Sequence, residues 1–212
     1  QCNPSDRKEA ILRAGQSRVA DAMVPLFEMV KDDSEDKALR VEAISAIGNF
    51  QTRRVLRPFE HLLSDPDPQI STAAAKGLAQ LAYMGDRYAI HLMKQLAARE
   101  GEDSLKTIAV VALGRAGKFS VSDDLIALLG SDQPTVRADA AEALGVVGDL
   151  RAVEPLIALL EDEDQTVRTK TCQALGQIGD PRASDALLDV AKNDKERYVR
   201  SDAAYALGLI AD

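Results

Sequence analysis

The residue types best suited to nucleophilic or metal chemistry are scarce in this sequence. It contains two cysteines, Cys2 and Cys172, and two histidines, His61 and His91. Nucleophilic catalysis by serine or cysteine needs a base, usually a histidine, beside the nucleophile. Neither histidine is placed by its helix beside a cysteine or a marked serine. We therefore predict no catalytic residues, no metal site and no cofactor.

Four arginines recur at one position of a repeated phrase, and they have two interpretations. They are Arg40, Arg137, Arg168 and Arg200. They form either an anion-binding row or a series of ion pairs between neighbouring units. Each follows the first buried residue of its helix and faces the next unit, which favours ion pairs, with Asp149 and Asp180 among the partners. Such pairs chiefly fix the register between repeats.

The elements that carry these residues repeat along the chain. Val136-Arg137 returns as Val167-Arg168, and Gly148-Asp149 returns as Gly179-Asp180, each displaced by 31 residues. Self-similarity at this period indicates a solenoid of stacked helix pairs. We predict an all-α fold, an α-α superhelix of about six and a half helix pairs of ~31 residues. It is expected to form a single solenoid over residues 1–212, with no separate catalytic domain.

The hydrophobic pattern divides each repeat into a first and a second helix. In the first, apolar residues follow the i, i+3, i+4, i+7 spacing of one buried face, as from Val153 to Leu160. Asp149 and Asp180 are placed to cap two first helices, and Gly148 and Gly179 to end the helices before them. Helices are expected near residues 5–15, 17–30, 35–48, 51–63, 67–83, 86–99, 102–116, 119–129, 133–147, 150–160, 164–178, 181–192 and 196–211.

Composition excludes several classes of function. The net charge is -8, from 34 acidic and 26 basic residues, so the average surface repels a polyanion and nucleic-acid binding is disfavoured. No apolar run approaches the ~20 residues that span a bilayer. Cys172 takes a position where other units carry alanine and is expected in the core. We expect a cytoplasmic protein, the alternative being an exported protein with a lipid on Cys2.

The phrase V-R-x-x-A-x-x-A-L-G-x-[IV]-G-D-x-R-A, carried by residues 136–152 and 167–183, resembles the HEAT-like repeat of the phycobilisome-lyase type. The resemblance implies a right-handed superhelix whose second helices line a concave surface. Proteins with this repeat include bilin lyase subunits and phycobilisome-degradation factors. A related branch, the deoxyhypusine hydroxylases, holds two irons with His-Glu pairs. Here neither His61 nor His91 is followed by glutamate, so this metal site is not expected.

The second-helix residues that are not part of the repeated phrase are expected to line the concave surface. A step of 100° per residue places Ala138, Asp139, Glu142 and Val146 opposite the buried arc of their helix. Ile108 and Val111 are apolar at such positions, although irregular stacking near Gly101 would bury them. The predicted partner-binding residues are Ile108, Val111, Arg115, Asp139, Glu142, Val146, Lys170, Tyr198, Asp202, Tyr205 and Leu209.

We therefore expect a non-enzymatic scaffold that binds a protein partner on the concave face. The alternative, which comes from the resemblance, is a subunit that assists the attachment of a tetrapyrrole to a phycobiliprotein or its removal.

Overall fold

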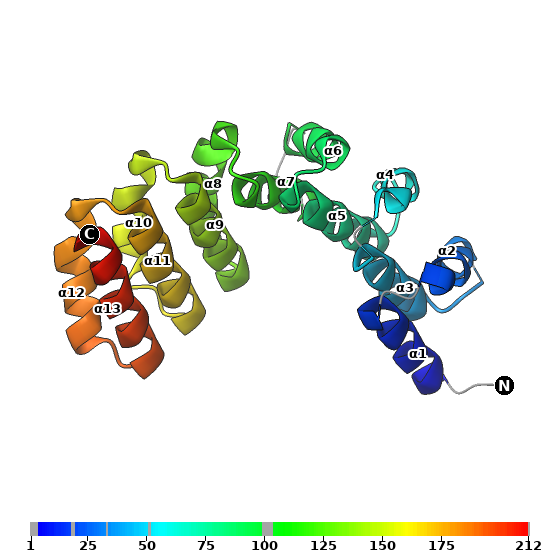
Figure 1. The fold of residues 1–212 in the computed structure, drawn as a ribbon, viewed down its shortest axis with the longest axis horizontal. Helices are drawn as coiled ribbons and strands as arrows, with labels where there is room; N and C mark the ends of the chain where they lie inside the picture. The colour runs from blue at the N-terminus through cyan, green and yellow to red at the C-terminus, as the bar shows by residue number, and fades with distance from the viewer. Residues whose placement is uncertain (1–3, 18–19, 33, 51, 99–103, 212) are drawn as a thin grey trace. The chain divides into compact units, whose positions relative to one another are not determined.

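The computed structural model describes residues 4–17, 20–32, 34–50, 52–98 and 104–211, and within these ranges every regular element is a helix (Figure 1). The contacts divide the chain into two compact units, which we call unit 1 (Gln1–Ala109) and unit 2 (Val110–Asp212). The prediction of an all-α fold built from helix pairs is confirmed. That residues 1–212 form one continuous solenoid stays a prediction.

Unit 1 alternates first and second helices. The second helices α1, α3 and α5 stack on one another, and α2, α4 and α6 cover them as first helices (Figure 1). The helices are α1 (Pro4–Ser17), α2 (Met23–Lys31), α3 (Lys37–Gly48), α4 (Leu56–Leu62), α5 (Pro68–Tyr83) and α6 (Arg87–Ala97). The next helix, α7 (Ser104–Arg115), contains the boundary between the two units.

Unit 2 repeats the same arrangement. The second helices α9, α11 and α13 lie side by side, and α8, α10 and α12 form the other layer (Figure 1). The helices are α8 (Ser122–Leu128), α9 (Pro134–Val147), α10 (Val153–Leu159), α11 (Gln165–Ile178), α12 (Ser184–Asn193) and α13 (Arg197–Ala211). Short 3₁₀ turns precede most first helices, at Ala20–Ala22, Arg53–Val55, Phe119–Val121, Leu150–Ala152 and Pro181–Ala183.

Within the described residues the predicted helices and their end signals are confirmed, but the α-helical part of several first helices begins later than expected, as in α2, which begins at Met23 and not at residue 17. Asp149 accepts a hydrogen bond from the Arg151 backbone N–H at 3.0 Å, and Asp180 accepts one from Arg182 at 2.9 Å. Gly148 ends α9 with φ of 72°. This left-handed conformation favours glycine, because a side chain would strain it. Capping is a local property, which explains why the sequence alone located these ends.

The buried arc of the second helices is wider than the hydrophobic pattern predicts. In α9, Ala140, Ala143 and Leu144 are fully buried as expected, whereas Val147 is only half-buried. Ala138 was expected to face solvent, and this is wrong: it is 6% exposed. The reason is that α9 packs against α11 and α8 while Ala143 also lies close to Gly114 of α7. A helix enclosed by neighbours buries more than one stripe.

Small residues meet wherever two successive second helices of unit 2 pack. A Cβ placed on Gly145 would lie 2.8 Å from Ala174 Cα, and one placed on Gly176 would lie 2.8 Å from Ala206 Cα. These distances are too short for a real Cβ, so glycine allows the backbones to approach. The repeated Ala-Leu-Gly letters are therefore a packing device.

Two of the four arginines, Arg137 and Arg168, form ion pairs across the repeats, but not with the predicted partners. Arg137 donates to both carboxylate oxygens of Asp162, at 2.7 and 2.8 Å, and Arg168 donates in the same way to Asp194, at 2.7 and 3.1 Å. These aspartates lie in the turn that precedes the next second helix. The prediction that Asp149 and Asp180 take part in these pairs is wrong. Their carboxylates bind Arg151 and Arg182, two residues further along the chain.

Among the helices described, none is both long and apolar enough to cross a bilayer. Cys2, the candidate for lipid attachment, lies outside the described residues, as does Gly101.

Candidate interaction surface

Four of the predicted contact residues form one ion-pair network on neighbouring helices of unit 2. Arg115 at the end of α7 donates to Asp139 at 2.6 Å and to Glu142 at 2.8 Å, both on α9. Lys170 on α11 lies 3.5 Å from the same Glu142 carboxylate. Sequence reasoning placed these residues on one surface but did not predict that they would neutralise one another.

The network determines the charge state of its central carboxylate. Partial burial raises the pKa of Glu142, but the positive charges of Arg115 and Lys170 outweigh this effect, and the pKa lies below its ordinary value. Glu142 is therefore ionised at neutral pH. Arg115 and Lys170 balance its negative charge. This part of the surface is therefore a polar row of paired charges, which we call the polar row, and not a patch of one charge sign.

The polar row continues to the last helix. Gln173 on α11 donates to Asp202 on α13 at 3.5 Å, which is a long hydrogen bond. Asp202 is half-buried and lies on the same face of α13 as Tyr198 and Tyr205. Side-chain contacts thus link α7 with α9 and α9 with α11 around Glu142, and a separate hydrogen bond links α11 with α13.

Apolar side chains accompany this polar row. Tyr198 and Tyr205 are 73% and 68% exposed, and Val146 and Leu209 are 46% and 41% exposed. Leu209 leans toward α11, because its Cδ1 would lie 3.3 Å from a Cβ placed on Gly176. We call the surface formed by Arg115, Asp139, Glu142, Val146, Lys170, Gln173, Tyr198, Asp202, Tyr205 and Leu209 the second-helix face.

Two predicted contact residues do not belong to this face. Val111 is 7% exposed, so the expectation that it faces solvent is wrong, and Ile108 is half-buried and lies in unit 1. The physical reason is the composition of α7, in which Leu105, Ala109 and Leu113 are buried as well. The buried residues of α7 thus cover more than one stripe, while Lys106, Thr107 and Arg115 remain partly exposed.

The residues with potential for nucleophilic or metal chemistry lie away from this face. Cys172 is fully buried, and burial raises the pKa of its thiol to about 12, so the reactive thiolate is absent at neutral pH. His61 and His91 are exposed on the first helices α4 and α6. The described residues contain no group of histidine, cysteine or carboxylate side chains arranged to hold a metal ion.

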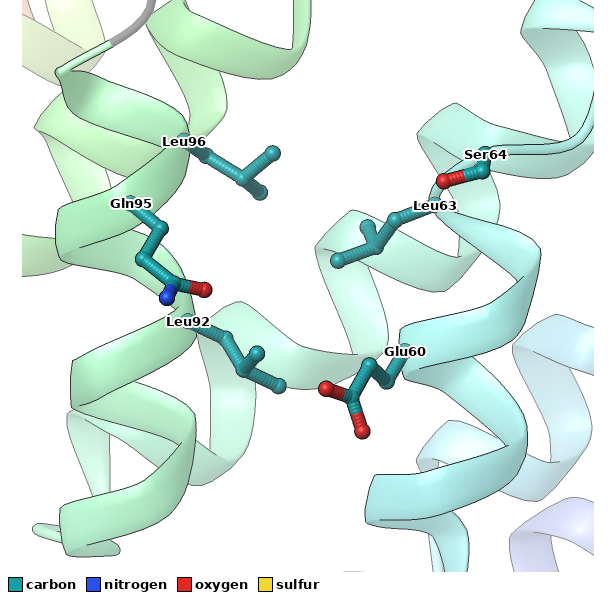
Figure 2. A pocket seen from close by; sticks show the side chains of 6 residues that line it. All are labelled: Glu60, Leu63, Ser64, Leu92, Gln95 and Leu96. Atoms are coloured by element: carbon teal, nitrogen blue, oxygen red, sulfur yellow. The ribbon is translucent and has the colours of Figure 1, made fainter.

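A small pocket lies between α4 and α6, where sequence reasoning indicated no site. Figure 2 shows its lining side chains, which come from Glu60, Leu63, Ser64, Leu92, Gln95 and Leu96. Its volume is about 170 Å³. Pockets that bind drug-sized ligands enclose roughly 300–1,000 Å³. The pocket is therefore a gap between neighbouring first helices that is too small for a drug-sized ligand.

Asp149, which is buried in the turn between α9 and α10, gives a test of the structure by pH. Hydrogen bonds from Arg151 lower the pKa of its carboxyl from 3.8 to about 2, against the burial that raises it. Ionised Asp149 therefore stabilises the fold above about pH 4, and this contribution is lost as the pH falls through 2. Asp149→Asn is expected to lower the free energy of unfolding by about 1–2 kcal/mol at pH 7. Urea unfolding of both proteins should show this difference shrinking between about pH 4 and pH 2.

Asp123→Asn is the matched control, because Asp123 also pairs with Arg151 but its side chain is 84% exposed. Its effect should stay within about 0.5 kcal/mol at every pH. A difference between wild type and Asp149→Asn that does not change with pH would contradict the assigned pKa.

Comparison with known proteins agrees with the stacked helix pairs. The family model for HEAT repeats matches residues 23–114 and 122–208, which is most of the chain. This protein belongs to the HEAT repeat family. The prediction of a HEAT-like repeat protein is thus confirmed. A search of curated proteins finds no match.

Solved HEAT-type structures share the fold at low sequence identity. The CpcE–CpcF complex of phycocyanin lyase from Nostoc sp. PCC7120 is 23% identical, with 98% of this chain and 83% of that chain covered and a TM-score of 0.60. Human deoxyhypusine hydroxylase is 23% identical over 97% and 79%, with a TM-score of 0.52. The archaeal HEAT-like repeats protein from Thermococcus onnurineus NA1 is 14% identical over 100% and 98%, with a TM-score of 0.55. These similarities concern the fold.

Proposed function

We propose that this HEAT repeat protein is a non-enzymatic scaffold that binds a protein partner on its second-helix face. The observation that carries the proposal is the pair of tyrosines on α13, Tyr198 and Tyr205, which are 73% and 68% exposed. Large aromatic side chains at such exposure leave apolar surface in water, and they are among the residues that contribute most to binding. Both lie on one side of the helix, with Asp202 between them.

The ion pairs around Glu142 support this function by holding the surface in shape. Arg115, Asp139, Glu142 and Lys170 restrain one another across three helices at 2.6–3.5 Å. A surface that is already ordered loses little conformational entropy when it binds. The tyrosines, Val146 and Leu209 would then supply apolar contacts, while the polar row sets the orientation of the partner.

The double variant Tyr198→Ser/Tyr205→Ser tests the proposal by affinity capture from the cells that express the protein. Loss of two anchor side chains at about 2 kcal/mol each is expected to reduce recovery of specific partners at least tenfold. Because both side chains are exposed, the melting temperature should change little. Quantitative mass spectrometry of the captured proteins measures the effect.

Leu150→Ser/Leu188→Ser is the matched control, since Leu150 and Leu188 are 57% and 43% exposed but belong to the first-helix layer. It should retain the partners. Equal recovery by the wild type and a folded tyrosine variant would show that the second-helix face is not the binding surface. Ile108 and Val111, which the sequence predicted as contact residues, are unsuitable for such a binding test. Val111 is buried, so replacing it with aspartate would bury a carboxylate and unfold the helix.

The alternative role in tetrapyrrole attachment or removal stays a prediction. The similarity to the CpcE–CpcF complex, at 23% identity, supports only the fold. Mixing the protein with phycocyanobilin and recording the visible absorption spectrum would test it, and an unchanged spectrum would count against a direct role in bilin binding.

A further inference from the structure

The first helices α4 and α6 of unit 1 are joined by a line of side-chain contacts, which we call the α4–α6 seam. Arg53, in the 3₁₀ turn before α4, donates to the carboxylate of Asp86 at 2.6 Å. Further along, the Tyr88 hydroxyl donates to Glu60 at 2.9 Å, and the Arg57 guanidinium lies 6.0 Å from the centre of the Tyr88 ring. These contacts advance in the same direction along both helices, so the helices run parallel on either side of the seam.

The small pocket lies at the far end of this seam (Figure 2). Its apolar wall is formed by Leu63, Leu92 and Leu96, which are 7%, 4% and 3% exposed. In Figure 2 the side chains of Leu63 and Leu96 point toward one another across the gap. A cavity of about 150 Å³ lined by aliphatic side chains holds a benzene ring. At about 170 Å³, the pocket therefore has the size of one apolar side chain.

The surface around the seam is basic, although the chain as a whole has a net charge of -8. The 3₁₀ turn before α4, α4 itself and α6 carry five cations and one carboxylate, Glu60. Asp86, which caps α6, adds a second carboxylate but is paired with Arg53. The four other cations are exposed, and none of them forms an ion pair with another described residue. They are Arg54, Arg57, Arg87 and Lys94.

The first helices of unit 2 have the opposite charge balance. With their 3₁₀ turns, α8, α10 and α12 carry three cations and five carboxylates. Two of these cations, Arg151 and Arg182, already bind carboxylates of their own repeats. The repeat folds with either balance, so stacking of the helix pairs does not require a basic surface. The charge of the α4–α6 seam is therefore a property of these two helices.

We propose that the α4–α6 seam is a second interaction surface, which binds an acidic peptide segment of a partner protein. One leucine, methionine or phenylalanine side chain of the segment enters the pocket. Aspartate or glutamate side chains beside it pair with Arg57, Arg54 and Arg87. Arginine suits this role, because its planar guanidinium offers two parallel N–H donors that match the two oxygens of a carboxylate.

A nucleic acid or an anionic membrane fits this surface less well than a peptide. Both spread negative charge over a wide area, whereas the cations here occupy two short helices of an acidic protein. Glu28 on the neighbouring first helix α2 is 68% exposed and would face such a polyanion with a like charge. Neither a phosphate backbone nor a lipid headgroup has an apolar side chain to place in the pocket.

Selection of a phage-displayed library of random peptides on the full chain tests the proposal. We expect selected sequences in which several carboxylates surround one large apolar residue. The probes are then these peptides, synthesised with a fluorescent label, and their affinity is measured by fluorescence anisotropy. Arg54→Glu/Arg57→Glu should weaken their binding at least tenfold, because two attractive charges become repulsive. A selection that yields no peptide of this composition would overturn the proposal.

Arg13→Glu is the matched charge control, because Arg13 lies on α1 of the same unit and its side chain is 75% exposed. It should leave the affinity unchanged. All three arginines are exposed, so the melting temperatures of both variants should stay close to that of the wild type. Equal affinity of the acidic peptides for the wild type and for folded Arg54→Glu/Arg57→Glu would show that they bind elsewhere.

Ser64→Trp tests the pocket separately from the charges. Ser64 is exposed at the rim of the pocket, so an indole at this position covers the pocket without burying a polar group. The variant should bind a selected peptide at least tenfold more weakly, since the apolar side chain of the peptide then stays in water. Replacing that residue of the peptide by serine should cause no further loss with Ser64→Trp. Full affinity with the pocket covered would overturn the assignment of the pocket.

Two further measurements distinguish this surface from other partners. Tyr198→Ser/Tyr205→Ser should leave the affinity for the acidic peptides unchanged, because the tyrosines belong to unit 2 and the seam belongs to unit 1. A loss would assign the peptides to the second-helix face. Cosedimentation with vesicles of phosphatidylcholine and phosphatidylserine should show no binding. Vesicle binding that Arg54→Glu/Arg57→Glu abolishes would identify an anionic lipid surface as the partner and overturn the choice of a peptide.

Discussion

Gly176→Leu is expected to lower the free energy of unfolding by about 3 kcal/mol. A Cβ at this position would lie 2.8 Å from Ala206 Cα and 2.9 Å from Ala206 Cβ, so the new side chain must push α13 away from α11. Rotation of a flexible side chain cannot relieve this clash, because the atom nearest to the added Cβ is the backbone Cα of Ala206. Loss of close packing along two helices outweighs the gain in helix propensity, which is below about 1 kcal/mol. Urea or thermal unfolding measures the change.

The same substitution at Gly208 separates packing from propensity. Gly208 occupies the equivalent position in α13, but an added Cβ there meets nothing within 4 Å. Gly208→Leu should therefore be neutral or stabilising by up to about 1 kcal/mol. Equal effects at the two positions would contradict the assignment of Gly176 to a helix contact.

Removing the buried guanidinium by Arg168→Met is expected to cost about 3–5 kcal/mol. The side chains of Arg168 and Asp194 are 5% and 8% exposed, and Arg168 also donates to the carbonyl oxygens of Asp162 and Glu163. Without Arg168, the Asp194 carboxylate is left in a nearly dry site without its counter-ion. Burial raises the pKa of Asp194, but hydrogen bonds from Arg168 and the Glu196 backbone, together with the positive charges of Arg168 and Lys195, bring it below its ordinary value. The variant should therefore also lose stability as the pH rises through the new, higher pKa of this carboxyl.

Two variants test whether the uncompensated charge causes this loss. Replacing both partners, Arg168→Met/Asp194→Leu, removes the buried charge and should recover a large part of the stability. Arg13→Met breaks the exposed pair with Glu9, whose side chains are 75% and 62% exposed, and should change stability by less than about 0.5 kcal/mol. If the double variant is as unstable as Arg168→Met, the buried charge is not the cause.

The candidate surface was only partly predictable from the sequence. The step of 100° per residue correctly placed Asp139, Glu142 and Val146 away from the core, because the direction of a side chain on a helix depends on local geometry. It failed at Ala138 and Val111, which are buried. Burial at such positions depends on how closely the neighbouring helices approach, and this is not encoded in the periodicity of a single helix.

The sequence by itself determined the repeat, the helix bounds and the helix ends, because hydrophobic periodicity, capping aspartates and left-handed glycines act within a few residues of one another. Only the tertiary structure decided which charges meet. Arg168 pairs with Asp194 instead of Asp180, and Glu142 lies between Arg115 and Lys170. These pairings join residues 26 to 28 positions apart, and they depend on the offset between stacked helices. That offset is fixed by packing contacts between helices, such as the contact of Gly176 in α11 with Ala206 in α13. The sequence pattern of one helix does not reveal such a contact.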